Sequence, residues 1–125
     1  MMQLQQRINA FVQLGSFLLQ FAEEKPTKES STLHNDTFFT EMTDALQLAK
    51  VSNAWFTDDN LQFTCKSWGE ALTESNVKKW LLAYNISEIS SNKRVAIVMA
   101  GNIPLVGFHD FMCVLLSGHS VLGKL

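Results

Sequence analysis

The stretch Lys93–Leu125, KRVAIVMAGNIPLVGFHDFMCVLLSGHSVLGKL, decides the fold that this sequence predicts. Residues 95–100 are apolar without alternation, which is typical of a strand covered on both faces, as in a parallel sheet. Gly101 and Asn102 then turn the chain. Pro104 follows at the expected first position of a helix. Proline is tolerated at this position because its missing N–H would have no intrahelical partner there. A strand followed directly by a helix is therefore expected.

The same stretch predicts a second strand after that helix. The helix should run to residue 116 or 117, with Gly118 as the left-handed exit residue. Residues 120–125 are again apolar, so the pattern is strand–helix–strand, which normally joins parallel strands by a right-handed crossover. A parallel pair buried on both faces needs more strands and helices around it. We therefore expect this sequence to be the N-terminal part of a larger α/β protein, truncated inside the second strand.

Composition narrows the class of protein. The chain has 125 residues, 46% of them hydrophobic, and a net charge of −2. This composition suits one globular domain with a modest core and gives no general attraction to nucleic acid or anionic membranes. The N-terminus lacks a secretion signal, and the apolar helix at 105–116 is too short to span a bilayer. Cys65 and Cys113 are expected to be free thiols, so we predict a cytoplasmic protein without a membrane span.

The region before residue 92 reads as helices followed by a polar linker at 85–92. The first helix is expected at about residues 3–22, with Gly15 marking a close contact between helices. We therefore expect a helical region at residues 1–92 and the start of an α/β domain at residues 93–125. The three further helices are expected to follow the cap Asn35 or Asp36, the cap Thr57 and the cap Thr73, and to end near residues 50, 69–73 and 84.

Two features of the α/β stretch are candidates for chemistry. The Gly101–Pro104 turn joins a buried strand to a helix, where α/β proteins place ligands and where free N–H groups attract anions. Asn102 could donate a hydrogen bond to an oxyanion, or it could simply cap the helix. Lys124 could reach a phosphate or ribose, or could face solvent at the end of its strand.

The remaining polar and aromatic candidates have structural interpretations. His34, His109 and His119 have no carboxylate or cysteine partner at an informative spacing, and the neighbours His109 and Asp110 should point in different directions. Cys65 and Cys113 lie in apolar helical patterns and are poor nucleophile candidates. The Trp55–Phe56 pair should staple the turn before a helix, with a partner-binding role as the alternative.

A family resemblance adds to this interpretation. VAIVMAGNIPLVGFHDFMCVLLSGHSVLGKL resembles the start of the cofactor-binding domain in the aldehyde dehydrogenase superfamily, whose Asn-aromatic-Pro turn corresponds to Asn102–Pro104. The whole chain is similar to the N-terminal part of the acyl-CoA reductase family, which includes the LuxC-like component of bacterial fatty acid reductases. The motifs AGNIPLVGFHD and SGHxVLxKL, with NAWFT and KSWGEAL before them, carry this resemblance.

The resemblance implies a Rossmann-like domain and an activity. Members of the family reduce a fatty acyl thioester, such as an acyl-CoA, to the aldehyde with NADPH through a thioacyl-cysteine. It implies that Asn102 is the oxyanion donor, that Lys124 contacts the adenosine ribose or 2′-phosphate, and that Gly101, Ile103 and Pro104 form the cofactor turn. The nucleophilic cysteine would lie beyond Leu125, so this piece alone should be inactive. A homo-oligomer or a fatty acid reductase complex would be the assembly.

Three positions depart from the aldehyde dehydrogenase pattern, which has Trp, Asn and Pro where this chain has Gly101, His119 and Leu125. These changes weaken any interpretation as an ordinary aldehyde oxidiser. A small helical protein-interaction module without enzyme activity is the main alternative. A different nucleotide-binding enzyme with the same opening unit is another.

Overall fold

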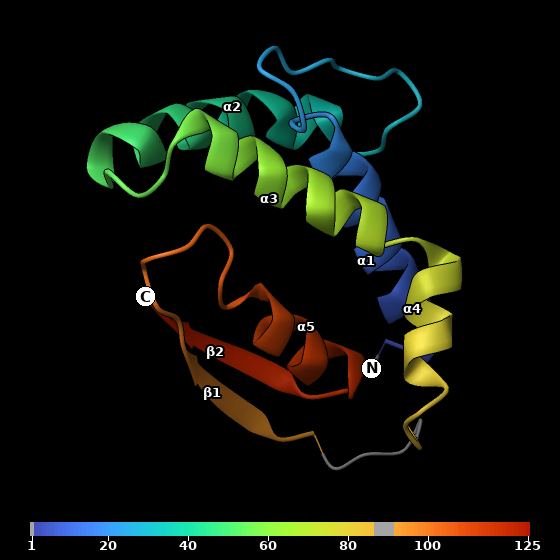
Figure 1. Ribbon diagram of the computed structural model, residues 1–125. Coiled ribbons are helices and arrows are strands. Elements are labelled where there is room, and N and C mark those ends of the chain that lie inside the picture. Colours follow the sequence, from blue (N-terminus) through green and yellow to red (C-terminus); the bar gives the residue numbers. More distant parts are fainter. Residues whose placement is uncertain (1, 87–91) are drawn as a thin grey trace. The chain divides into compact units, whose positions relative to one another are not determined.

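A computed structural model describes residues 2–86 and 92–125 of the chain (Figure 1). The fold is mixed α/β, mostly helical, with a small two-stranded parallel sheet. Along the chain the elements of the described residues are α1 (Leu4–Leu19), α2 (Asn35–Ser52), α3 (Asp58–Ala71), α4 (Glu74–Leu81), β1 (Arg94–Val98), α5 (Phe108–Leu116) and β2 (Ser120–Lys124).

The chain divides into two compact units. The α/β unit comprises Met1–Phe11 and Glu74–Leu125, and the helical unit comprises Val12–Thr73. The first turns of α1 therefore belong with α4 and the strands, whereas its later turns belong with α2 and α3.

The core of the helical unit is built from the later turns of α1 and from α3. Phe21 is 2% exposed, and its ring centroid lies 5.3 Å from that of Phe17 and 5.1 Å from that of Phe39 of α2. A Cβ atom added to Gly15 would lie 2.7 Å from the Leu72 Cβ and 2.8 Å from the Leu72 carbonyl oxygen. Only a residue without a side chain allows this approach, so the close helix contact expected at Gly15 is confirmed.

The helix boundaries correct the sequence prediction in three places. Asn35 is the first residue of α2 rather than a cap, and the cap position belongs to His34, with φ 68° and no side-chain hydrogen bond. α1 ends at Leu19 rather than near residue 22, and α4 ends at Leu81 instead of reaching Tyr84, whereas α3 ends at Ala71 within the expected range. The cap at Thr57 is confirmed, because its side chain accepts a hydrogen bond of 3.2 Å from the Asn60 N–H.

The α/β unit contains the expected strand–helix–strand arrangement. β1 and β2 pair in parallel, from Arg94 opposite Ser120 to Val98 opposite Lys124. Figure 1 shows α5 lying along one face of this pair. The strand ends at Val98 rather than at residue 100.

The helix of this unit begins later than the sequence predicts. Pro104 is not its first residue, because α5 starts at Phe108. Leu105 has φ 57°, a left-handed conformation that a right-handed helix starting at Pro104 could not contain. Residues 101–107 are consequently a short irregular segment of bends and turns.

Burial of the sheet is one-sided. Val95 and Ile97 are half-buried, whereas Arg94, Ala96 and Val98 on the alternate positions of β1 are exposed. Val98 is 84% exposed and Leu122 of β2 is 57% exposed. Within the described residues only one face of the pair is covered, so cover of the second face by further elements stays a prediction.

Candidate functional site

The carboxyl ends of β1 and β2 bring the predicted site residues to one edge of the sheet. Val98 is paired with Lys124, and the Met99 N–H donates a 2.8 Å hydrogen bond to the Lys124 carbonyl oxygen. The chain therefore leaves β1 beside Lys124 and enters the turn at 101–104 directly afterwards. This follows from the parallel register, because parallel strands end at the same edge.

Asn102 lies exposed in this turn and does not cap α5. The cap position belongs to Gly107, which forms no side-chain hydrogen bond there. The structural alternative for Asn102, a helix cap, is therefore wrong. The neighbouring Ile103 is 54% exposed, whereas Pro104 is buried and anchors the turn.

Met99 is a residue of this edge that the sequence interpretation missed. A Cβ atom added to Gly107 would lie 2.5 Å from the Met99 Cγ, and one added to Gly123 would lie 3.2 Å from the Met99 Cε. Two glycines thus make room for one flexible side chain between the loop and β2. Both glycines come well after Met99 in the sequence, so no local pattern marks the contact.

The edge offers groups that suit an anionic cofactor such as NADPH. Lys124 is exposed, and it forms no ion pair with an acidic side chain in the described parts of the chain. A Cβ atom added to Gly101 would meet no atom within 4 Å, so the backbone there is open to a neighbour. The helix N-terminus expected next to Asn102 is displaced to Phe108.

A second candidate site is a cavity of about 350 Å³ inside the α/β unit, large enough for a small ligand. His109 and Cys113, one turn apart on α5, lie in its wall. The Cys113 Sγ is 3.8 Å from Nδ1 and 4.0 Å from Nε2 of His109. The cavity is lined by Trp80, Leu81, Tyr84, Ile86, His109, Cys113, Leu116 and Ser117.

The two cysteines differ in how deeply they are buried, and burial raises the pKa of both thiols. Burial raises the pKa of the Cys65 thiol to about 11, and only 2% of that residue is exposed. Cys113 is half-buried, and its pKa is also raised, first by burial and then by the charge of Asp110. Both are free thiols, as expected.

The sequence interpretation of His109 was wrong on one point. His109 does have a cysteine partner at an informative spacing, because residues i and i+4 lie on one helix face. Its Nδ1 also lies 3.8 Å from the Asp110 Oδ1, although neighbours on a helix were expected to diverge. The signal that could have identified the pair was H-x-x-x-C in a helix. His119 has a structural role, since its Nδ1 accepts a 3.2 Å hydrogen bond from the Lys93 N–H.

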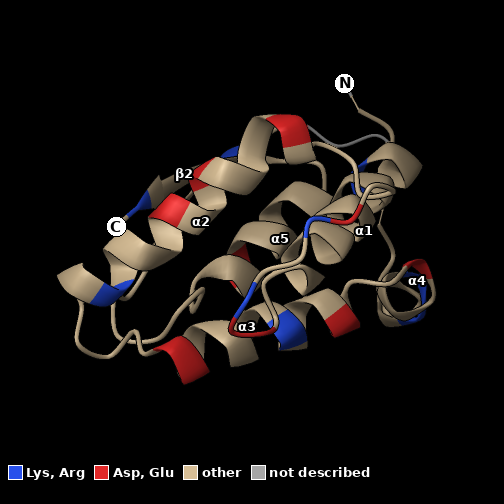
Figure 2. Cartoon of the chain, turned by 90° about the horizontal axis from the view of Figure 1, so that it is seen from above, with Lys and Arg blue, Asp and Glu red and all other residues tan. Residues whose placement is uncertain are grey.

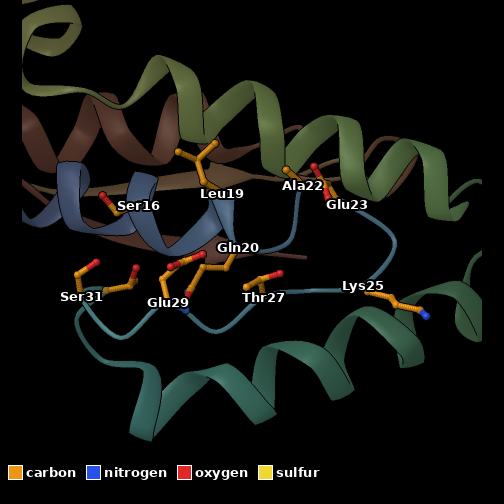
Figure 3. A pocket seen from close by; sticks show the side chains of 10 residues that line it. Ser16, Leu19, Gln20, Ala22, Glu23, Lys25, Thr27, Glu29 and Ser31 are labelled. Atoms are coloured by element: carbon orange, nitrogen blue, oxygen red, sulfur yellow. Dashed lines mark hydrogen bonds between the residues drawn. The ribbon is translucent and has the colours of Figure 1, made fainter.

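A third hollow, in the helical unit, is lined by Gln20 and by the loop after α1 (Figure 3), and Gln20 belongs to a buried pair of amides. Gln20 and Asn35 are 6% and 7% exposed. Gln20 Nε2 donates to Asn35 Oδ1 at 2.8 Å, and Asn35 Nδ2 donates to Gln20 Oε1 at 2.7 Å. The Glu29 backbone completes the network, donating its N–H to Gln20 Oε1 and accepting from Asn35 Nδ2. These bonds hold the loop after α1 and use every N–H group of the two amides.

The distribution of charge favours no nucleic-acid surface. Figure 2 shows α2 acidic along most of its length with a basic residue near its end, and residues of both signs on α3 and α4. Within residues 2–86 and 92–125, no group of three or more His, Cys, Asp or Glu side chains could hold a metal ion. None of the described helices is long and apolar enough to cross a membrane.

Comparison of the chain with protein-family models, with curated proteins and with solved structures finds no match in any of the three. The resemblance to acyl-CoA reductases therefore remains a prediction from the sequence motifs.

Proposed function

We propose that this chain is the N-terminal part of a cytoplasmic, NADPH-dependent acyl-CoA reductase with a Rossmann-like cofactor domain. The parallel register of β1 and β2 is the observation that carries the proposal, because it puts the Asn102 turn and Lys124 at one strand edge. Ligands of open α/β sheets bind outside the carboxyl ends of the strands. The motif resemblance assigns the oxyanion and cofactor roles to the same residues.

Each residue of the edge has a distinct role in this proposal. The Asn102 amide donates a hydrogen bond to the thioester oxygen as negative charge develops on it. The Lys124 ammonium binds the adenosine ribose or 2′-phosphate of NADPH, and Gly101, Ile103 and Pro104 shape the turn beside the cofactor. NADPH supplies the hydride when bound. The nucleophilic cysteine lies outside these 125 residues, since neither Cys65 nor Cys113 occurs in the family's motif.

The test is an assay on the full product of the reading frame. We expect NADPH- and acyl-CoA-dependent formation of aldehyde, trapped as its hydrazone. Asn102→Ala should lower kcat by about 10²–10³-fold, as loss of an oxyanion donor does. Lys124→Met should raise the KM for NADPH by roughly tenfold, which is the worth of one charged hydrogen bond.

Lys93→Met is the matched control, because Lys93 precedes β1 at the opposite edge of the sheet. It should leave both constants unchanged. Absence of aldehyde from every acyl thioester tested would exclude the reductase. Equal effects of Lys93→Met and Lys124→Met would remove the cofactor role of Lys124.

The interaction-module alternative has one observation in its favour. Trp55 is 71% exposed, so it does not staple the turn before α3. Two hydrogen bonds hold its backbone in place: the Trp55 N–H donates to Asn53 Oδ1, and Asn60 Nδ2 donates to the Trp55 carbonyl. An exposed aromatic side chain on a fixed loop is a common anchor in protein interfaces. Under this alternative, Trp55→Ala abolishes partner binding, whereas under the reductase proposal it leaves turnover unchanged.

A further inference from the structure

The Cys113–His109 pair combines a nucleophile, a base and a cavity in the α/β unit. The cysteine sulfur lies within 4.0 Å of both ring nitrogens of His109. The His109 side chain is 60% exposed, so its ring can exchange protons with water. Neither residue is used by the proposed reductase site, which lies at the carboxyl edge of the strands.

The surroundings of Cys113 make a neighbouring base necessary. Burial and the Asp110 carboxylate both disfavour the thiolate and raise the pKa of Cys113. A thiol of this kind reacts readily only if a base removes its proton as the new bond forms. In the tautomer that carries the proton on Nδ1, the nitrogen 3.8 Å from the Asp110 Oδ1, the His109 Nε2 lies 4.0 Å from the Cys113 sulfur and can accept the thiol proton.

The cavity determines which electrophile can approach. The Trp80 and Tyr84 rings pack edge to face at 6.0 Å, and the Trp80 ring lies 5.8 Å from that of His109. Together with aliphatic side chains such as Leu81 and Leu116, these rings make a lining whose described residues include no carboxylate, ammonium or guanidinium group. Such a lining favours an uncharged molecule with a hydrocarbon tail.

We propose that Cys113 is a covalent binding site for aliphatic α,β-unsaturated aldehydes, with His109 as the proton acceptor and the Trp80 cavity holding the alkyl tail. In the reaction the Cys113 sulfur bonds to the β-carbon, and the electron pair of the carbon–carbon double bond moves to the α-carbon. The thiol proton passes to His109 and from there to the α-carbon. No group leaves and no oxidant or reductant is needed.

The experiment uses the purified 125-residue chain with 2-nonenal and with crotonaldehyde, which carry the same reactive group and differ only in the alkyl tail. Adducts are fixed with borohydride and located by peptide mapping. Each rate is divided by the rate of the same aldehyde with N-acetylcysteine. We expect the adduct on Cys113 and a normalised rate about tenfold or more higher for 2-nonenal, because its additional methylene groups are partly buried.

His109→Gln should slow the 2-nonenal reaction by about tenfold or more, as loss of a general base does. His34→Gln, the same substitution at an exposed histidine of the helical unit, should leave the rate unchanged. Cys113→Ser should abolish the adduct while the protein still unfolds cooperatively. The proposal is overturned by modification at Cys65 in place of Cys113, by equal normalised rates for the two aldehydes, or by an unchanged rate in His109→Gln.

Discussion

The Phe21 core of the helical unit and the two-stranded sheet of the α/β unit bury their apolar side chains to different extents. In the helical unit, α1, α2 and α3 bury one another's side chains, and Phe21 retains only 2% of its exposure. In the α/β unit, β1 and β2 leave Val98 84% exposed and Leu122 57% exposed. Helices joined by short loops can cover one another locally, whereas a parallel sheet needs elements on both faces. The outer face of the sheet therefore leaves apolar surface uncovered around Val98, whereas in the helical unit such exposure lies away from the Phe21 core, at Val51 and Phe63.

Buried polar groups show the same contrast. In the helical unit, the Gln20 and Asn35 amides use all their N–H groups on each other and on backbone carbonyls. In the α/β unit, buried Arg7 donates from Nη1 to the Met2 carbonyl and from Nη2 to the Leu116 carbonyl at 3.2 Å. Its Nε has no hydrogen-bond partner among the described residues. The guanidinium suits the carboxyl end of α5, where the helix dipole favours a cation.

The largest predicted effect tests the contrast in apolar burial. Phe21→Ala removes a ring from the closed core and should lower the free energy of unfolding by about 3–5 kcal/mol. Val98→Ala removes exposed methyl groups and should change it by less than about 0.5 kcal/mol. Urea unfolding followed by circular dichroism measures both. A cost for Val98→Ala close to that for Phe21→Ala would mean that the exposed face of β1 is covered in solution, and the contrast would fail.

A smaller effect is expected from the buried amide pair. Asn35→Ala removes the partner of one Gln20 N–H and of the Glu29 carbonyl, and one of the two donors to Gln20 Oε1, so it should cost about 1–3 kcal/mol. Asn9→Ala is the matched control: it also removes an asparagine hydrogen bond, from Gln5 at 2.8 Å, but this bond is exposed. It should cost well under 1 kcal/mol. Equal losses in the two variants, measured by the same urea titration, would show that burial does not strengthen the network.

Local sequence signals predicted much of the fold. The parallel strand–helix–strand unit followed from its apolar runs and glycines, the α3 cap from Thr57, and the close helix contact from Gly15. Two features depended on contacts distant in sequence. Asn35 was predicted as a cap because nothing nearby shows that Gln20 and Glu29 take up its amide, and the late start of α5 depends on the left-handed Leu105.

The candidate sites also differ in whether the sequence can predict them. The strand edge with Asn102 and Lys124 was predictable, because parallel topology alone brings strand ends together. The Cys113–His109 pair was also local in sequence. Its signal is the i, i+4 spacing on one helix face, and the prediction considered only the adjacent pair His109 and Asp110. The cavity beside it was not predictable, since Trp80 and Tyr84 are brought there from a segment well before the strands.

The smallest predicted effect concerns charge at the start of α4, in the α/β unit. Glu74 lies 2.7 Å from Lys78 one turn later, and this ammonium lowers the pKa of Glu74 below its ordinary value of 4.5, with a weaker contribution from the Gln5 amide. A carboxylate whose pKa is lowered by folding stabilises the protein above its unfolded pKa, and this stabilisation disappears as the pH falls through the folded pKa. Glu74→Gln should therefore lower the melting temperature slightly at neutral pH, and the difference should close in acid below pH 4.5. In a Lys78→Met background the difference should be much smaller at neutral pH, because the main partner of the carboxylate is gone. A difference in melting temperature that persists unchanged in acid would mean that Glu74 acts through packing or helix propensity. The ion pair between Glu74 and Lys78 would then not stabilise the α/β unit.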